Sequence, residues 1–374
     1  MKKILSTCFF IIAIATVSAQ EIKLEPNFQK GLKFYHSGEY RVALDHFNNA
    51  VKAMPDNAAA YYYLGYVYSN LGNTPQSGES FKKGYDIEPD NVEIMAALAN
   101  YYIDINEFKK AENLLDKAIK ISPNYPESYN NRGVLLFRKG QFKLALENYN
   151  TAIKLDSSFA LAYSNRGTAR YYNQDVANAS KLDVRLAISD FNKALQLAPN
   201  LEVALKNRGF AYRLLGEVDS SMADYDAYIT NNSRNESGYI ERGRLKMELK
   251  DYKSALEDFM TALELKPDAA HAYYERAHAK TKLNYYNEAI NDLIKAIAYD
   301  PQFTGNSTYK MAANYALMNE KAKSLKFLKQ CLANKYFQNP KRLQAFVDDA
   351  DFDNLKKDAD FIALREKAIK QVKR

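Results

Sequence analysis

Five arginines recur along the chain, and most are followed by an acidic residue at a regular distance. The arginines are Arg132, Arg166, Arg208, Arg242 and Arg276. Asp224, Asp258 and Asp292 each lie sixteen residues after an arginine, whereas Asp190 follows Arg166 after a longer step and Arg132 is followed by Asn148. A planar guanidinium can hold a carboxylate through two hydrogen bonds. The spacing therefore predicts four structural ion pairs: Arg166–Asp190, Arg208–Asp224, Arg242–Asp258 and Arg276–Asp292.

A second chemical grouping consists of His271 and His278, two helical turns apart with Glu275 between them. Imidazole and carboxylate groups bind zinc, but two histidines without a close third ligand are weak evidence for a metal site. We therefore predict no metal. The sequence also lacks a Ser-His-Asp arrangement, a glycine loop for phosphate and a CxxC motif. We expect no cofactor and no enzymatic activity.

The elements that carry these residues are copies of one unit. Prolines recur every 34 residues at Pro55, Pro89 and Pro123, and after a 42-residue step the series continues through Pro199, Pro267 and Pro301, with Ser157 and Ser233 at the two remaining positions. Large residues three or four apart within each unit predict two helices. A fixed period of this length indicates a stack of helical units, each of which contacts its neighbours.

Small and turn-forming residues keep the same period. Glycine or asparagine separates the two predicted helices at Gly38, Gly72, Asn106, Gly140, Gly216, Asn284 and Asn319. These residues tolerate the left-handed backbone that ends a helix. Small residues inside the helices should let the pair cross closely, while a bulky residue such as Phe81 or Phe259 fills the space between them. Tyr228 occupies a small position, so we expect a wider crossing in the sixth unit. The Asp or Asn after each proline is expected to cap the next helix.

The helix, turn and proline positions together resemble the tetratricopeptide repeat family. The resemblance covers residues 24–336 as nine units: 24–57, 58–91, 92–125, 126–159, 160–201 with an insertion, 202–235, 236–269, 270–303 and a degenerate 304–336. Tyrosine replaces the tryptophan of the family's fourth position at Tyr61, Tyr129, Tyr163, Tyr239 and Tyr273. The resemblance implies an all-α solenoid, a right-handed superhelix of helix pairs whose first helices line a concave groove for peptides or proteins.

The predicted partner-binding residues follow from that implied groove. The second, fifth, sixth, ninth and twelfth positions of each first helix lie near one face. Aromatic side chains there would be rigid anchors, and asparagine could both donate to and accept from a peptide backbone. The predicted groove residues are Phe28, Tyr35, Tyr62, Tyr66, Asn130, Asn131, Asn165, Tyr171, Asn207, Arg213, Glu241, Arg244, His271, Glu275 and His278. We expect the partner to be another protein or an extended peptide.

Composition narrows the class of partner. The net charge is +7, but the charges are interspersed without a basic block. Nucleic-acid binding needs a clustered basic patch, so we expect no nucleic-acid partner. Of the two cysteines, Cys331 occupies a small packing position and is expected to be a buried apolar residue.

The two ends of the chain differ from the repeats. Residues 1–19 have a positive start at Lys2 and Lys3, a short apolar stretch and a small-residue cleavage site, which predict a signal peptide removed before Gln20. Residues 20–23 would be a short tail, and no integral membrane segment would remain. Residues 337–374 contain the motif Asp-Phe-x-x-Leu twice and are predicted to be a helical cap on the last repeat. The insertion in the fifth unit, between Tyr171 and Arg185, is either a tolerated loop or a contact finger.

Two functional hypotheses remain open from the sequence. The first is an exported, non-enzymatic scaffold whose groove binds a segment of another protein, within a bacterial cell-envelope complex. The alternative is a structural assembly protein of a secretion or outer-membrane biogenesis machine, acting through its edges or through self-association. We expect a periplasmic location, with secretion or surface association as alternatives, and the oligomeric state stays undetermined.

Overall fold

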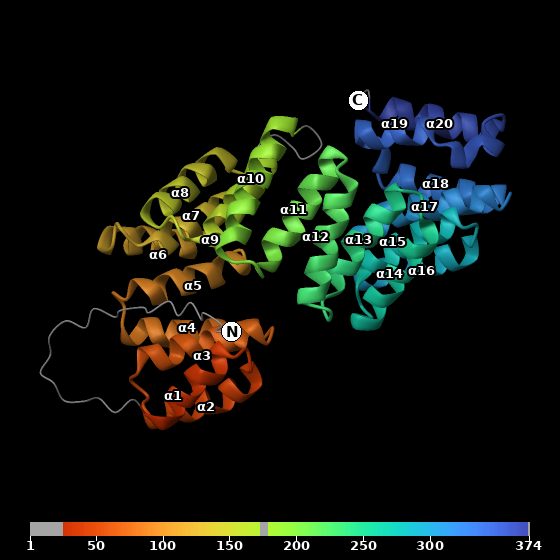
Figure 1. Ribbon diagram of the computed structural model, residues 1–374. Coiled ribbons are helices and arrows are strands. Elements are labelled where there is room, and N and C mark those ends of the chain that lie inside the picture. Colours follow the sequence, from red (N-terminus) through yellow and green to blue (C-terminus); the bar gives the residue numbers. More distant parts are fainter. Residues whose placement is uncertain (1–24, 173–178, 373–374) are drawn as a thin grey trace, which may run out of the picture. The chain divides into compact units, whose positions relative to one another are not determined.

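The computed structural model describes residues 25–172 and 179–372, and this part of the chain contains twenty α-helices and no strand (Figure 1). The predicted all-α class, built from consecutive helix–turn–helix pairs, is confirmed. The helices form two compact units, one ending at Gln141 and the other beginning at Phe142. This division falls inside the predicted fourth repeat, between its two helices, so each unit is described separately.

The N-terminal unit contains seven of these helices. They are α1 (Pro26–His36), α2 (Tyr40–Ala53), α3 (Ala58–Asn70), α4 (Thr74–Ile87), α5 (Val92–Asp104), α6 (Phe108–Ile121) and α7 (Pro126–Arg138). Consecutive helices pack as pairs, and the second helix of each pair also packs against the first helix of the next pair. This is the packing that the 34-residue period predicts.

The C-terminal unit continues the same pattern and ends in a different one. Its repeat helices are α8 (Phe142–Leu155), α9 (Ala160–Tyr172), α10 (Lys181–Leu197), α11 (Glu202–Leu215), α12 (Val218–Asn231), α13 (Glu236–Glu248), α14 (Tyr252–Leu265), α15 (Ala270–Lys282), α16 (Tyr286–Tyr299), α17 (Thr304–Leu317) and α18 (Lys321–Ala333). Short 3-10 segments (η2, Pro301–Phe303; η3, Tyr336–Gln338; η4, Ala350–Leu355) and two further helices, α19 (Pro340–Asp348) and α20 (Ala359–Val372), complete it.

The turns inside the repeats have the predicted backbone. All seven predicted glycine and asparagine positions have positive φ, from 60° at Asn319 to 78° at Gly38. Lys250 adopts the same conformation, with a φ of 61°, although its residue type gave no signal for it. Each of these eight first helices therefore stops sharply at a left-handed residue that reverses the chain.

The predicted helix caps are wrong by one residue. The N-cap of α3 is Asn57, and that of α5 is Asn91, whose side chain accepts from the backbone N–H groups of Glu93 and Ile94 at 3.0 and 3.2 Å. The residues expected to cap, Asp56 and Asp90, lie one position earlier in the turn. Where the later position is not polar, as at the start of α15, no side chain caps the helix.

Glycine permits close contact between the helices of a repeat. A Cβ atom at Gly65 would lie 2.5 Å from the ring of Phe81, and one at Gly243 would lie 2.6 Å from the ring of Phe259. Both rings are buried. The bulky side chain of the second helix therefore lies directly on the glycine of the first, which explains why a residue with low helix propensity stands there.

Tyr228 is accommodated by a second change in the next repeat. The tyrosine is buried, and its ring faces Gly238 of α13, where a Cβ atom would lie 3.0 Å from the Tyr228 Cδ1 atom. In the preceding repeat the small position holds Ala194, and the counterpart of Gly238 is Ala204. The large residue thus meets a glycine across α12 and α13, which belong to different repeats.

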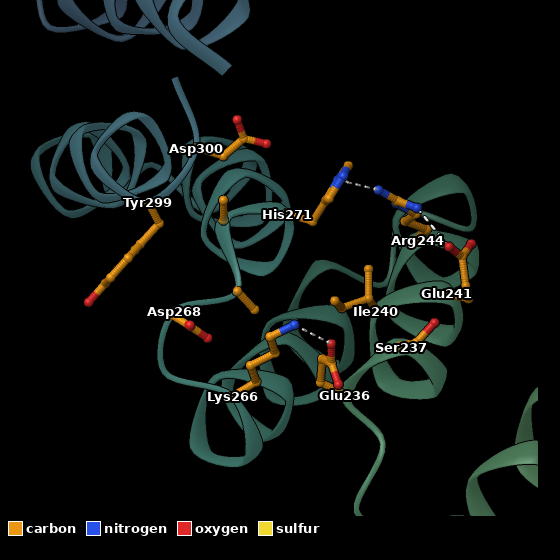
Figure 2. A pocket seen from close by; sticks show the side chains of 12 residues that line it. Glu236, Ser237, Ile240, Glu241, Arg244, Lys266, Asp268, His271, Tyr299 and Asp300 are labelled. Carbon is orange, nitrogen blue, oxygen red and sulfur yellow. Dashed lines mark hydrogen bonds and ion pairs between the residues drawn. The ribbon is translucent and has the colours of Figure 1, made fainter. Parts of the chain in front are cut away.

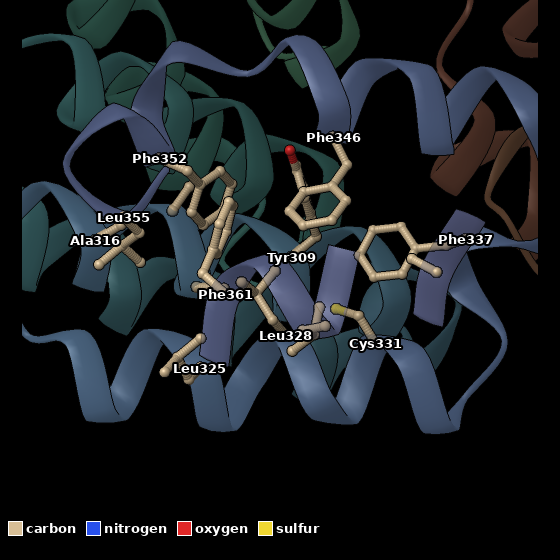
Figure 3. Close-up of a cluster of buried hydrophobic side chains, with 14 residues drawn as sticks. Tyr309, Ala316, Leu325, Leu328, Cys331, Phe337, Phe346, Phe352, Leu355 and Phe361 are labelled. Atoms are coloured by element: carbon tan, nitrogen blue, oxygen red, sulfur yellow. The ribbon is translucent and has the colours of Figure 1, made fainter. Parts of the chain in front are cut away.

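The last repeat is covered by an aromatic cluster (Figure 3). Phe337, Phe346, Phe352 and Phe361 are buried together against Tyr309 of α17. The first Asp-Phe-x-x-Leu motif forms η4, whereas the second begins α20. Cys331 is 1% exposed in this cluster, and burial raises the pKa of its thiol to about 12. At neutral pH the thiol therefore stays protonated and serves as packing.

Some predicted features lie outside the described residues. These are the signal peptide at 1–19, the tail at 20–23 and residues 173–178 of the fifth-repeat insertion. Within the ranges that the structure describes, no helix is long and apolar enough to cross a membrane.

Candidate functional site

The predicted arginine–aspartate pairs are brought together by the two helices of each repeat. Arg208 donates from Nε and Nη2 to the two oxygens of Asp224 at 2.8 and 2.6 Å, and Arg276 donates in the same way to Asp292 at 2.8 and 2.7 Å. The two remaining pairs, Arg166–Asp190 and Arg242–Asp258, have the same two-bond geometry. The aspartates are 3–5% exposed, so these ion pairs lie within the helix packing.

Three of these carboxylates also hold a second cation. Asp258 accepts Lys246 at 2.8 Å, Asp292 accepts Lys280 at 2.7 Å, and Asp190 accepts Arg170 at 2.7 Å. In each case the second cation lies one helical turn after the repeat's arginine, a spacing that sequence analysis could have noticed. Asp224 lacks this partner because Tyr212 occupies that position, and the ring lies 5.9 Å from the Arg208 guanidinium. Each charge is thus largely compensated inside the array.

The arginines also reach the preceding repeat, which the sequence interpretation missed. Arg166 Nη1 donates to Asn150 at 2.8 Å, Arg208 Nη1 to Asn192 at 2.7 Å and Arg242 Nη1 to Asp226 at 2.7 Å. Each acceptor lies sixteen residues before its arginine. Each of these three arginines therefore joins three helices, two in one repeat and one in the repeat before it.

The inner face is defined here by the second, fifth, sixth, ninth and twelfth positions of the first helices. In the N-terminal unit, the rings of Tyr62 and Tyr66 lie 4.9 Å apart and nearly perpendicular, at 81°. Tyr35 joins them through Tyr63, whose ring lies 5.6 Å from that of Tyr35. All four are only partly buried. Burial is also the main reason that the pKa values of Tyr35, Tyr62 and Tyr66 are raised, so these phenols are neutral at physiological pH.

Three predicted groove residues are interior side chains, which corrects the sequence interpretation. Phe28 is 5% exposed, Asn130 is 2% exposed and Tyr171 is 2% exposed. Phe28 packs on Phe47, whereas Tyr171 packs on Phe191 and Phe210. Asn130 and Tyr171 are the fifth and twelfth residues of their helices, as predicted, whereas Phe28 is the third residue of α1. However, neighbouring elements cover these side chains, which leaves them little surface for a partner.

The asparagines on the inner face hold neighbouring helices together. Asn131 Nδ2 donates to the carbonyl of Ala96 on α5 at 3.0 Å, and Asn207 Nδ2 donates to Thr168 on α9 at 2.9 Å. Asn165 is half-buried and also engaged in an interaction. One N–H of each of these two amides is therefore already used within the array, and the expected grip on a guest backbone, which would fall to the remaining donor and acceptor, stays a prediction.

In the C-terminal unit, Arg244 is the centre of the inner-face charges (Figure 2). It donates to Glu275 at 2.9 Å and to Glu241 at 2.7 Å, and its Nη2 lies 3.4 Å from Nδ1 of His271. Burial alone would lower the pKa of Arg244, but the charges of Glu275 and Glu241 outweigh it and raise the pKa. Arg213 pairs with Glu248 at 3.3 Å.

Two hollows meet at Glu241 and Arg244. One, of about 400 Å³, lies between α13 and α15 and is lined by Ile240, Lys266 and His271, among others (Figure 2). The other, of about 290 Å³, lies along α9, α11 and α13. Its walls include Tyr172 and Lys206. Because the two hollows share these two residues, they adjoin on the inner face, and together they are called the groove of the C-terminal unit.

The two histidines have different surroundings. His271 is exposed at the rim of the groove, with its ring edge-on to Phe303 at 4.7 Å. His278 is half-buried, and burial, with the nearby charges of Lys310 and Lys282, lowers its pKa to about 4. Among the described residues, no group of three or more potential ligands could hold a metal ion.

Comparison with known families identifies the repeat. A family model described as TPR repeat matches residues 31–72, 99–140 and 133–174, and one described as Tetratricopeptide repeat matches residues 58–91, 237–269 and 270–303. Together the matches cover more than half of the chain. The chain belongs to the tetratricopeptide repeat family. Tetratricopeptide repeats form scaffolds for protein–protein interaction, and proteins built from them are generally not catalytic.

Solved tetratricopeptide repeat structures have the same fold. The Cut9–Hcn1 hetero-tetramer of the APC/C matches with a TM-score of 0.59 and 16% identity, over 74% of this chain and 53% of that chain. A tetratricopeptide repeat protein from Parabacteroides merdae matches with a TM-score of 0.50 and 18% identity, over 68% of this chain and 97% of that chain. The present chain therefore spans about half the length of the first protein. No curated protein sequence matches it.

The tyrosines that replace the family's tryptophan contact the repeated arginines. We call the series of arginines Arg166, Arg208, Arg242 and Arg276, with their acidic partners, the arginine ladder. The guanidinium of Arg166 lies 5.3 Å from the ring centre of Tyr163, and that of Arg276 lies 5.3 Å from the ring centre of Tyr273. The same pairing occurs at Arg132 and Arg242, each with the tyrosine three residues earlier. These cation–π contacts strengthen each arginine's hold on its own helix.

Proposed function

We propose that this protein is an exported, non-enzymatic scaffold that binds an extended segment of another protein along the inner face of its repeats. Within this proposal, it acts as part of a bacterial cell-envelope complex. The observation that carries the binding role is the groove of the C-terminal unit, in which two hollows join at Glu241 and Arg244. The several polar side chains of this surface offer donors and acceptors for the backbone of a peptide guest.

The groove combines apolar contact area with charges already held in place. Ile240 and Tyr299 provide apolar surface, while Lys266 is paired with Glu236 at 3.3 Å. Because these charges are fixed by internal partners, a guest would meet a preorganised surface and lose less conformational entropy on binding. The proposed export depends on the sequence of residues 1–19 alone.

Site-specific photo-crosslinking in the native cells tests the binding role. A photoreactive phenylalanine analogue at Ser237, which lines the larger hollow, should give a discrete adduct with one partner protein. The same analogue at Glu257, an exposed residue of α14, is the matched control. An adduct at Ser237 but not at Glu257 supports the groove. Adducts only at Glu257, or only between copies of this chain, would instead support the assembly hypothesis.

A further inference from the structure

A smaller hollow in the N-terminal unit has chemistry that the proposed scaffold role does not explain. It measures about 230 Å³ and lies between α3, α4 and α5. Three aromatic rings line it: Tyr66, Phe81 and Tyr101. The rings of Tyr66 and Phe81 lie 5.1 Å apart and nearly perpendicular. Aromatic faces carry negative electrostatic potential, so a hollow lined by them attracts cations as well as apolar groups.

A glycine gives Tyr101 its place in this wall. The ring of Tyr101 lies against Gly78 of α4, where any Cβ atom would collide with it. Gly78 is additional to the repeating small positions, so the helix-pair packing alone does not require it. The glycine at position 78 therefore leaves room for the aromatic ring of Tyr101 at this hollow.

Two polar groups belong to the hollow. Ser77 is 3% exposed and lines it. Asp104 lies at the rim, and its closest cation, Arg138, is 4.0 Å away, too far for a hydrogen bond. Partial burial raises the pKa of Asp104, and Arg138 only partly offsets this effect. The hydroxyl of Ser77 and the carboxylate of Asp104 can both accept from a positively charged donor.

The surrounding inner face carries no competing cation. Counted from the repeat starts at residues 24, 58, 92 and 126, no lysine, arginine or histidine occupies the second, fifth, sixth, ninth or twelfth position. Glu93 and Glu127 lie near enough to Tyr66 to contribute to the raised pKa of its phenol. An acidic guest would therefore be repelled, and an apolar guest would make no use of Ser77 and Asp104.

From these observations we propose that the hollow between α3, α4 and α5 binds the side chain of an arginine in the partner protein. The guanidinium would stack on the aromatic wall and donate to the Ser77 hydroxyl and the Asp104 carboxylate. Arginine fits better than lysine because its planar group stacks on rings, is weakly hydrated and carries five donors for several acceptors. This inference rests on the proposed function, since it assigns part of the guest segment.

Saturation-transfer NMR with small probes tests the hollow without the native partner. The probes are N-acetyl-arginine methylamide, its neutral isostere N-acetyl-citrulline methylamide and the corresponding lysine compound, each titrated into the full protein. We expect the arginine probe to bind and Asp104→Asn to weaken it about tenfold, the size of one lost charged contact. Ser77→Ala should weaken it by a smaller factor. Glu79→Gln, which removes an exposed acid of α4, should leave binding unchanged.

The outcomes separate this inference from the broader function. Equal binding of the citrulline probe, or unchanged affinity in Asp104→Asn, would overturn the cation site. Equal or tighter binding of lysine would overturn the assignment to arginine. If Asp104→Asn melts at or above the temperature of the wild type, its weaker binding of the probe cannot be the result of unfolding. Because Ser77 and Asp104 belong to the N-terminal unit and Ser237 to the C-terminal unit, the crosslinking result remains an independent test of the scaffold role.

Discussion

Arg242 and Asp258 face each other across the two helices of one repeat and are joined by hydrogen bonds of 3.1 and 2.6 Å. Asp258 also holds Lys246, and Arg242 also reaches Asp226 in the repeat before. The pair is thus the centre of a network that spans three helices. Its aspartate is almost fully buried, which makes the balance of charge sensitive to any single change.

Asp258→Asn should destabilise the protein strongly. The substitution leaves Arg242 and Lys246 facing an uncharged amide, so we expect a loss of about 2–4 kcal/mol, as for a broken buried ion pair. The shift of the urea unfolding midpoint measures it. Asp226→Asn is the matched control, because Asn150 and Asn192 serve as acceptors at the equivalent position in other repeats. A wild-type midpoint for Asp258→Asn would show that the pair does not stabilise the array.

Met260→Asp should stabilise the protein by extending the ladder. Met260 lies sixteen residues before Arg276, where Asn150, Asn192 and Asp226 stand in the other repeats, and it is 45% exposed. A new acceptor for Arg276 should add about 0.5–1 kcal/mol, since the pair would be partly exposed. Thermal unfolding is the measurement. Met260→Asn should give part of this gain in stability, and Met260→Leu should give none. Equal stability of all three variants would mean that Arg276 does not reach position 260.

Gly238→Ala should destabilise the junction of α12 and α13. The added Cβ would lie 2.8 Å from Ile229 and 3.0 Å from Tyr228, an overpacking that costs about 1–3 kcal/mol. In the Tyr228→Ala background, where the pair resembles Ala194 and Ala204, Gly238→Ala should cost less, because the tyrosine ring no longer crowds the added Cβ. A double-mutant cycle by urea unfolding measures the coupling. If the two changes in the free energy of unfolding simply add, Tyr228 and Gly238 do not pack against each other.

Stability should fall between neutral and acidic pH partly through His278. Its pKa drops from 6.5 to about 4 on folding, so between these values the unfolded chain binds more protons than the folded one. The contribution of His278 to the free energy of unfolding is complete above pH 6.5 and is lost as the pH falls towards 4. It amounts to about 2–3 kcal/mol at most. His278→Gln should flatten the stability curve in this window. An unchanged slope from pH 7 to pH 4 would exclude the histidine as its cause.

The N-terminus of the protein isolated from its own cells should be Gln20. Cleavage needs a small residue at Ala19, so Ala19→Leu should leave the longer chain, while Gln20→Ala should still be processed. Intact-mass spectrometry of the two variants and the wild type measures this directly. An unprocessed wild-type chain in the cytoplasmic fraction would rule out the proposed export.

Much of the fold follows from the sequence because the repeat makes one local pattern visible many times. The left-handed turns at Gly38 and Asn319 and the pairing of Arg208 with Asp224 are relations inside a single repeat. Lys250 shows the limit, since its left-handed backbone is imposed by the repeat geometry and not by its residue type.

The candidate site was harder to predict, because helical position indicates where a side chain begins and not what covers it. Tyr171 and Asn131 both occupy inner positions, yet one is packed under neighbouring rings and the other is bound to the Ala96 carbonyl. The hollow beside Asp104 gave no sequence signal, because its three aromatic rings come from separate helices.

The sequence by itself determined the repeat, its two helices, its turns and the ion pairs within each repeat. These depend on contacts at fixed separations, which a periodic chain displays directly. Only the tertiary structure decided which inner-face groups remain available and where arginines such as Arg242 reach the preceding repeat. Those features arise where side chains from successive helices compete for the same space and the same hydrogen bonds, and that competition is settled by packing.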